Sequence, residues 1–151
     1  MYKDQLRDLI ERTLRGINKY SPEAVNLLMG TCAQESRLGV YIKQLSSGPA
    51  LGVFQMEPFT FNDIVNCYLA FNESLAQKIK NECDVSIFKS EALEYNLKLA
   101  ICFTRVHYLR FPEPLPNDLD GMARIWKKRY NTILGAGSEE EFIKNYERYL
   151  L

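Results

Sequence analysis

Apolar residues recur at helical spacing along most of this chain, which predicts a mostly α protein. The first apolar face is formed by Leu6, Leu9, Ile10, Leu14 and Ile17. A second helix is expected over residues 22–36, because Ser21 can cap it and Pro22 suits its first turn. No linker, repeat or low-complexity tract interrupts the pattern, so residues 1–151 are expected to form a single domain.

The segment 90–110 is apolar on most sides and predicts the longest helix, buried at the centre of the fold. Shorter helices are expected from Thr60 to about Phe71, over 73–82 and from Asp118 to Tyr130. A last helix is expected to open at a capping box, formed by Ser138 and Glu141.

Residues 40–58 are rich in Gly, Pro and Ser and break the helical pattern. Within them, Val40-Tyr41-Ile42 and Val53-Phe54 could pair as a short hairpin. The expected fold is therefore mostly α, with a small irregular lobe of hairpin and loop.

Charge and composition exclude some classes of function. Lys+Arg and Asp+Glu both number 19, so no excess of basic charge indicates nucleic-acid binding. The basic run from Lys127 to Arg129 is interpreted as a solvated helix face. No apolar stretch approaches the roughly 20 residues of a membrane span, and the N-terminus lacks a signal pattern. We expect no membrane insertion, synthesis in a cytoplasm, and delivery by another route if the protein acts outside.

The residues that commonly bind metals are few and dispersed. The four cysteines have no CxxC spacing and lie in apolar helical contexts, so they are interpreted as buried free thiols. The single histidine, His107, is interpreted as a hydrogen-bonded helix residue rather than a base. No metal site and no cofactor is expected.

Glu35 is the candidate catalytic residue. It lies near the end of an apolar helix, where desolvation would keep a carboxyl protonated near neutral pH. Cleavage of a glycosidic bond needs such an acid, facing the leaving oxygen. A glycine-rich turn that carries Gln55 follows, and the alternative is a surface Glu at a helix end.

Three blocks resemble the lytic transglycosylase (SLT) domain of the lysozyme-like superfamily. They are Glu35-Ser36, the segment SSGPALGVFQMEPFT at residues 46–60, and Tyr130-Asn131. The resemblance spans roughly residues 22–137, and the whole chain looks most like small phage-encoded members.

The resemblance implies a lysozyme-like α+β fold and cleavage of the β-1,4 bond between N-acetylmuramic acid and N-acetylglucosamine in peptidoglycan. Glu35 would act first as acid and then as base, giving 1,6-anhydro-muramic products, while Ser36 would support the helix end. Ser46 and Gln55 would hydrogen-bond sugar groups, with turn stabilisation as the alternative. Tyr130 would point its hydroxyl at Glu35 or at the N-acetyl group, and Asn131 would also contact the glycan, whereas Trp126 is interpreted as packing. The expected setting is the bacterial cell wall or periplasm, reached as an endolysin or a phage virion component.

The chain departs from the family pattern at two places. Glu57 stands where the family usually has Met, and goose-type lysozymes have an acidic residue there. An inverting hydrolase with Glu35 as acid and Glu57 as base is therefore the second hypothesis, and it requires carboxyls about 6.5–9.5 Å apart. The usual Ala-Gly after Tyr130-Asn131 is missing. A third hypothesis is a non-catalytic virion or wall-binding protein with the same fold.

Overall fold

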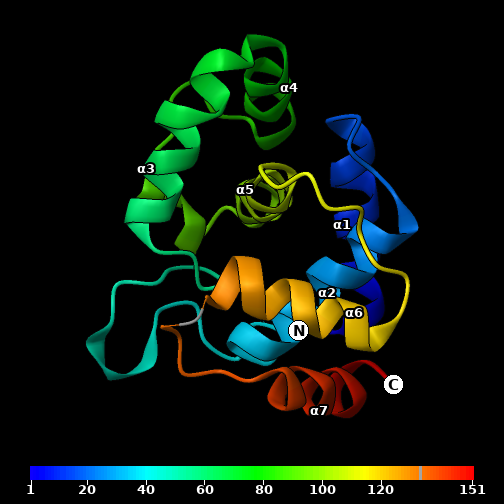
Figure 1. The fold of residues 1–151 in the computed structure, drawn as a ribbon. Helices are drawn as coiled ribbons and strands as arrows, with labels where there is room; N and C mark the ends of the chain where they lie inside the picture. The colour runs from blue at the N-terminus through cyan, green and yellow to red at the C-terminus, as the bar shows by residue number, and fades with distance from the viewer. Residues whose placement is uncertain (133) are drawn as a thin grey trace.

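The protein is mostly helical in a computed structural model that describes residues 1–132 and 134–151 (Figure 1). The described α-helices are α1 (Lys3–Gly16), α2 (Pro22–Ser36), α3 (Pro58–Cys67), α4 (Glu73–Cys83), α5 (Leu97–Leu109), α6 (Leu119–Ile125) and α7 (Glu139–Leu150). Short 3-10 helices lie at Leu45–Ser47, Leu69–Phe71 and Ser90–Glu94, and a π-helical turn covers Trp126–Asn131.

Helix α5 occupies the middle of the molecule. Figure 1 shows it nearly end-on, with α1, α3, α4 and α2 around it, and all four contact it. Nearly all of its side chains are buried, as expected for a central helix that is apolar on most sides. Stacking of Phe61 on Phe103, with ring centroids 4.0 Å apart, joins α3 to it.

The helix boundaries confirm some sequence predictions and correct others. Ser21 caps α2, and Ser138 with Glu141 forms the capping box of α7. The predicted helix over 90–110 is instead two helices, because the Asn96 side chain accepts a hydrogen bond from Leu99 N and starts α5 there. Helix α3 begins at Pro58, before the predicted Thr60 cap, and ends at Cys67.

The predicted hairpin between residues 40–42 and 53–54 does not form. In the described part of this segment, only two isolated antiparallel bridges occur, Lys43 with Leu51 and Leu51 with Met56. Positive φ angles at Ser46, Gly52 and Gln55 turn the chain too often for paired strands to extend. The segment is a folded loop, tied by its backbone hydrogen bonds.

A further prediction concerns the environment of the four cysteines. Cys32, Cys83 and Cys102 are buried free thiols as predicted, but Cys67 at the end of α3 is exposed.

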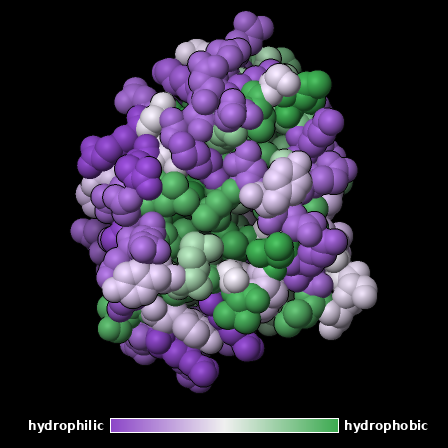
Figure 2. Space-filling model, turned by 180° about the vertical axis from the view of Figure 1, so that it is seen from behind, coloured by the Kyte–Doolittle hydropathy of each residue, from purple (hydrophilic) through white to green (hydrophobic). Residues whose placement is uncertain are grey.

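Hydrophilic side chains cover most of the face in Figure 2, around a central group of apolar ones. No described helix has both the length and the apolar character needed to cross a membrane.

Candidate functional site

Helix α2 carries Glu35 in its last turn. The helix ends at Ser36 because Arg37 takes a left-handed conformation, with φ 54°, and its N–H bonds back to the carbonyl of Ala33. Leu38 and Gly39 also have positive φ, so the chain turns sharply away from the helix axis. Glu35 is thereby presented where α2 meets the loop of residues 40–57.

Ser36 fastens this loop to the end of α2. Its buried hydroxyl donates to the carbonyl of Val53 at 2.6 Å and accepts from the backbone N–H of Gly39 at 2.8 Å. The predicted supporting role of Ser36 is confirmed. Tyr41 adds a second tie, because its hydroxyl donates to the backbone carbonyl of Glu35 at 2.8 Å.

The carboxyl of Glu35 lies in a desolvated setting. Burial raises its pKa from 4.5 to about 7, although a hydrogen bond from Trp126 acts in the opposite direction. That bond runs from the indole Nε1 to Glu35 Oε1, over 2.9 Å. Glu35 is therefore largely protonated at pH 6 and can both give and take a proton near neutrality.

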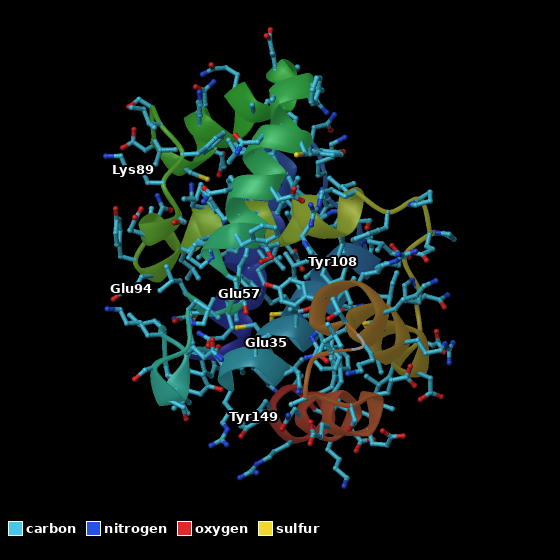
Figure 3. All side chains as sticks on the ribbon, turned by 60° about the vertical axis from the view of Figure 1, so that its left-hand side comes forward. Glu35, Glu57, Lys89, Glu94, Tyr108 and Tyr149 are labelled. Carbon is cyan, nitrogen blue, oxygen red and sulfur yellow. The ribbon has the colours of Figure 1, made fainter. Side chains whose placement is uncertain are left out.

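Glu35 faces a cavity of about 640 Å³ that also receives Glu57. Figure 3 labels Glu35 and Glu57 near the middle of the molecule, in the region where the loop, α2 and the π-helical turn meet. The lining comes from α2, the loop, the start of α3, α5, the π-helical turn, residues 132 and 135–137, and the first turn of α7. Its volume lies within the range of ligand-binding sites in proteins.

The loop residues predicted to act at the site are Ser46 and Gln55, as substrate-binding residues, and Glu57, as the base of the inverting alternative. Gln55 and Glu57 line the cavity, Glu57 as the exposed residue before α3. Gln55 also holds its own turn, because its side-chain Nε2 donates to Gly52 O at 2.9 Å. Ser46 is exposed in the 3-10 turn and is not part of the cavity lining, although its neighbour Leu45 is.

Gly52 is required where the loop meets the 3-10 helix Ser90–Glu94. Its φ is 78°, and a Cβ there would lie 2.3 Å from the carbonyl oxygen of Leu93. The close approach of the backbones at Gly52 and Leu93 fixes the position of the turn that carries Gln55, relative to the 3-10 helix. No larger residue fits this position without displacing the loop.

Tyr130 and Asn131 line the cavity from the π-helical turn, at the end of the helix predicted from Asp118 to Tyr130. The Tyr130 hydroxyl donates to the carbonyl of Phe54 at 2.7 Å and not to Glu35, and burial raises the pKa of Tyr130 well above its ordinary value. Asn131 Oδ1 accepts from Lys127 Nζ at 2.7 Å. The π-helical geometry is thus associated with the cavity, as π-turns often are with functional sites.

The basic run from Lys127 to Arg129 makes specific contacts and is not simply a solvated face. Lys127 Nζ donates to Asn131 and also to the carbonyl of Gly135 at 2.9 Å. Lys128 and Arg129 both pair with Glu113. These contacts brace the π-helical turn that carries Tyr130.

His107 lines the cavity but has both ring nitrogens engaged. Nδ1 lies 2.7 Å from Arg110 Nη2, which can only donate, and Nε2 lies 2.7 Å from the carbonyl of Arg129. Burial lowers the pKa of His107 to about 4, so the ring is neutral near pH 7. The prediction of a hydrogen-bonded helix residue is confirmed.

Sequence reasoning missed the roles of Trp126 and Tyr41 beside Glu35. Trp126 packs against Phe142 as predicted, with centroids 5.4 Å apart, but it also donates to the carboxyl. Trp126 and Glu35 are separated by 91 residues, and Trp126 is the only tryptophan. The available signal for this role was a single tryptophan four residues before Tyr130. That spacing indicates packing as well as it indicates a hydrogen bond to Glu35.

Comparisons with known proteins identify no relative. No protein-family model, no curated protein and no solved structure matches the chain. Within the described residues, no group of three or more His, Cys, Asp or Glu side chains is arranged to hold a metal ion. The resemblance to lytic transglycosylases stays a prediction.

Proposed function

We propose that this protein is a lysozyme-like enzyme that cleaves the β-1,4 bond between N-acetylmuramic acid and N-acetylglucosamine in peptidoglycan, as a lytic transglycosylase. The observation that carries the proposal is the carboxyl of Glu35, which lines an open cavity and has a pKa of about 7. An acid that is protonated near neutral pH is what cleavage of a glycosidic bond requires.

In the proposed reaction, Glu35 gives its proton to the glycosidic oxygen as the bond from that oxygen to the anomeric carbon breaks. The bonding electron pair leaves with the oxygen, and positive charge develops on the sugar ring. The C6 hydroxyl oxygen of the same sugar then bonds to the anomeric carbon, and its proton returns to Glu35. One carboxyl suffices, because the nucleophile is held within the substrate and no water must be activated.

Product analysis tests this proposal directly. Purified peptidoglycan is incubated with wild type and with Glu35→Gln, and the soluble fragments are identified by mass spectrometry. Fragments ending in 1,6-anhydro-muramic acid from the wild type alone support the proposal. If neither protein releases fragments, although circular dichroism shows both folded, a non-catalytic wall-binding or virion role replaces it.

Inverting hydrolysis is the second candidate, favoured by the position of Glu57. Its exposed side chain lines the same cavity as Glu35, so it could activate a water molecule there. Reducing-end fragments, and their loss in Glu57→Gln, would favour this mechanism. Anhydro fragments released at the wild-type rate by Glu57→Gln would exclude Glu57 as an essential base.

The partner implied by this proposal is the glycan strand of peptidoglycan, met in the cell wall or periplasm. The enzyme would reach that substrate as a phage endolysin or as a component of the virion. Loss of lytic activity in particles that carry Glu35→Gln, with normal particle assembly, would support the virion setting.

A further inference from the structure

Trp126 makes a hydrogen bond of defined direction to the Glu35 carboxyl. Its indole Nε1 lies 2.9 Å from Glu35 Oε1. An indole N–H is a donor only, so it needs an oxygen that offers a lone pair. When Glu35 is neutral, the proton-free carbonyl oxygen is the better acceptor, which leaves the acidic proton on Oε2.

The indole is held rigidly. Trp126 is 1% exposed and packs against Phe142 of α7 at an interplanar angle of 31°. Gly137 closes over its far edge, where a Cβ would lie 2.6 Å from Trp126 Cη2. A donor fixed in this way does not reorganise when charge develops on the carboxyl, which is the condition for electrostatic preorganisation.

The remaining titratable groups around the carboxyl do not replace this donor. The cavity is lined by Tyr41, Glu57, His107, Tyr130 and Glu141. Cys32 and Tyr108 are buried outside this lining and interact electrostatically with Glu35. Tyr41 donates to the Glu35 backbone, Tyr130 to Phe54, and Tyr108 pairs with Thr31. Across residues 1–132 and 134–151, Trp126 is the one side chain that hydrogen-bonds the Glu35 carboxyl.

We propose that Trp126 is the positioning residue for proton transfer at Glu35: its N–H reserves Oε1 and leaves Oε2 as the oxygen that exchanges its proton with the substrate. The proposal rests on the proposed function. It adds that the same N–H stabilises the carboxylate formed when Glu35 protonates the leaving oxygen. Glu35 then stays ionised until it accepts the proton of the C6 hydroxyl as the base of the second step.

The wild-type protein provides the first test, because a single tryptophan gives a single indole N–H signal in a ¹H–¹⁵N spectrum. We expect the chemical shift of that signal to change with pH, with the same midpoint as the titration of the Glu35 carboxyl. The carboxyl titration is measured separately by ¹³C NMR. In Glu35→Gln, the amide oxygen still accepts the bond but does not ionise, so this transition should disappear. An indole signal that does not follow Glu35 between pH 5 and 9 would overturn the proposal.

The second test is Trp126→Phe, which keeps an aromatic ring against Phe142 but removes the N–H. Loss of a hydrogen bond to the carboxylate should raise the Glu35 midpoint by about 1–2 pH units. The basic limb of the kcat/KM profile should move upward by the same amount, and kcat should fall on the order of tenfold. The packing control is Phe142→Leu, which loosens the indole contact without removing the donor.

The outcomes separate the two proposals. If Trp126 only fills the core, Trp126→Phe and Phe142→Leu will lower stability alike and leave the Glu35 midpoint at its wild-type value. If the wild type releases no peptidoglycan fragments, the proposed function fails, while both NMR readouts still report whether Trp126 controls the carboxyl.

Discussion

Replacing Glu35 with Gln should stabilise the protein at alkaline pH and have little pH-dependent effect at acid pH. Burial favours the neutral form of this carboxyl, whose pKa is about 7 in the folded protein and 4.5 when unperturbed. Between these values the unfolded chain releases its proton while the folded protein keeps it. The free energy of unfolding of the wild type therefore falls as pH rises through this window.

The size of the effect follows from the two pKa values. Their difference corresponds to about 3 kcal/mol, which is fully present as a penalty above pH 7 and absent below pH 4.5. Gln has the same shape and never ionises, and its side-chain oxygen can still accept from Trp126 Nε1. The variant should thus gain up to about 3 kcal/mol over the wild type between pH 4 and pH 8.

Urea denaturation followed by far-UV circular dichroism, at intervals from pH 4 to pH 8, measures this difference. Circular dichroism is preferred to fluorescence because the only tryptophan contacts the mutated side chain. Glu57→Gln is the matched control, since it removes a carboxyl from the exposed side of the same cavity. A stability difference between Glu35→Gln and wild type that stays constant with pH would refute the desolvation of Glu35.

Three further substitutions test the supports of the site. Ser36→Ala leaves Val53 O and Gly39 N without their partner and should lower the free energy of unfolding by about 2 kcal/mol in urea; an unchanged midpoint would contradict the fastening role. Gly52→Ala meets Leu93 O and a positive φ, so it should cost more than about 1 kcal/mol and shift the loop amides in NMR spectra. Tyr130→Phe removes the donor to Phe54 O and should cost about 1 kcal/mol in the same urea assay, with Tyr149→Phe as a control on α7.

Much of the secondary structure could be predicted from the sequence. The apolar periodicity and the caps at Ser21 and Ser138 are local signals, and the helices they predict are present. The boundary at Asn96 was misplaced because a continuous apolar pattern does not show where a side chain will cap. Helix α3 begins at Pro58 with no side-chain cap at Glu57, so the predicted cap at Thr60 was wrong. The hairpin prediction was wrong because β-branched residues alone cannot override the repeated positive φ angles of residues 46–55.

The site was determined only in part by the sequence. The placement of Glu35 at the end of an apolar helix is local, and it already predicted a desolvated carboxyl. Its donor could not be predicted, since Trp126 reaches it from 91 residues away through the packing of the π-helical turn between α6 and α7. The same packing turns Tyr130 toward Phe54, and the left-handed turns of the loop place Ser46 outside the cavity while bringing Gln55 and Glu57 into it. Periodicity and capping act between residues a few positions apart, whereas hydrogen bonds across a cavity depend on how whole helices pack, and that information exists only in the folded chain.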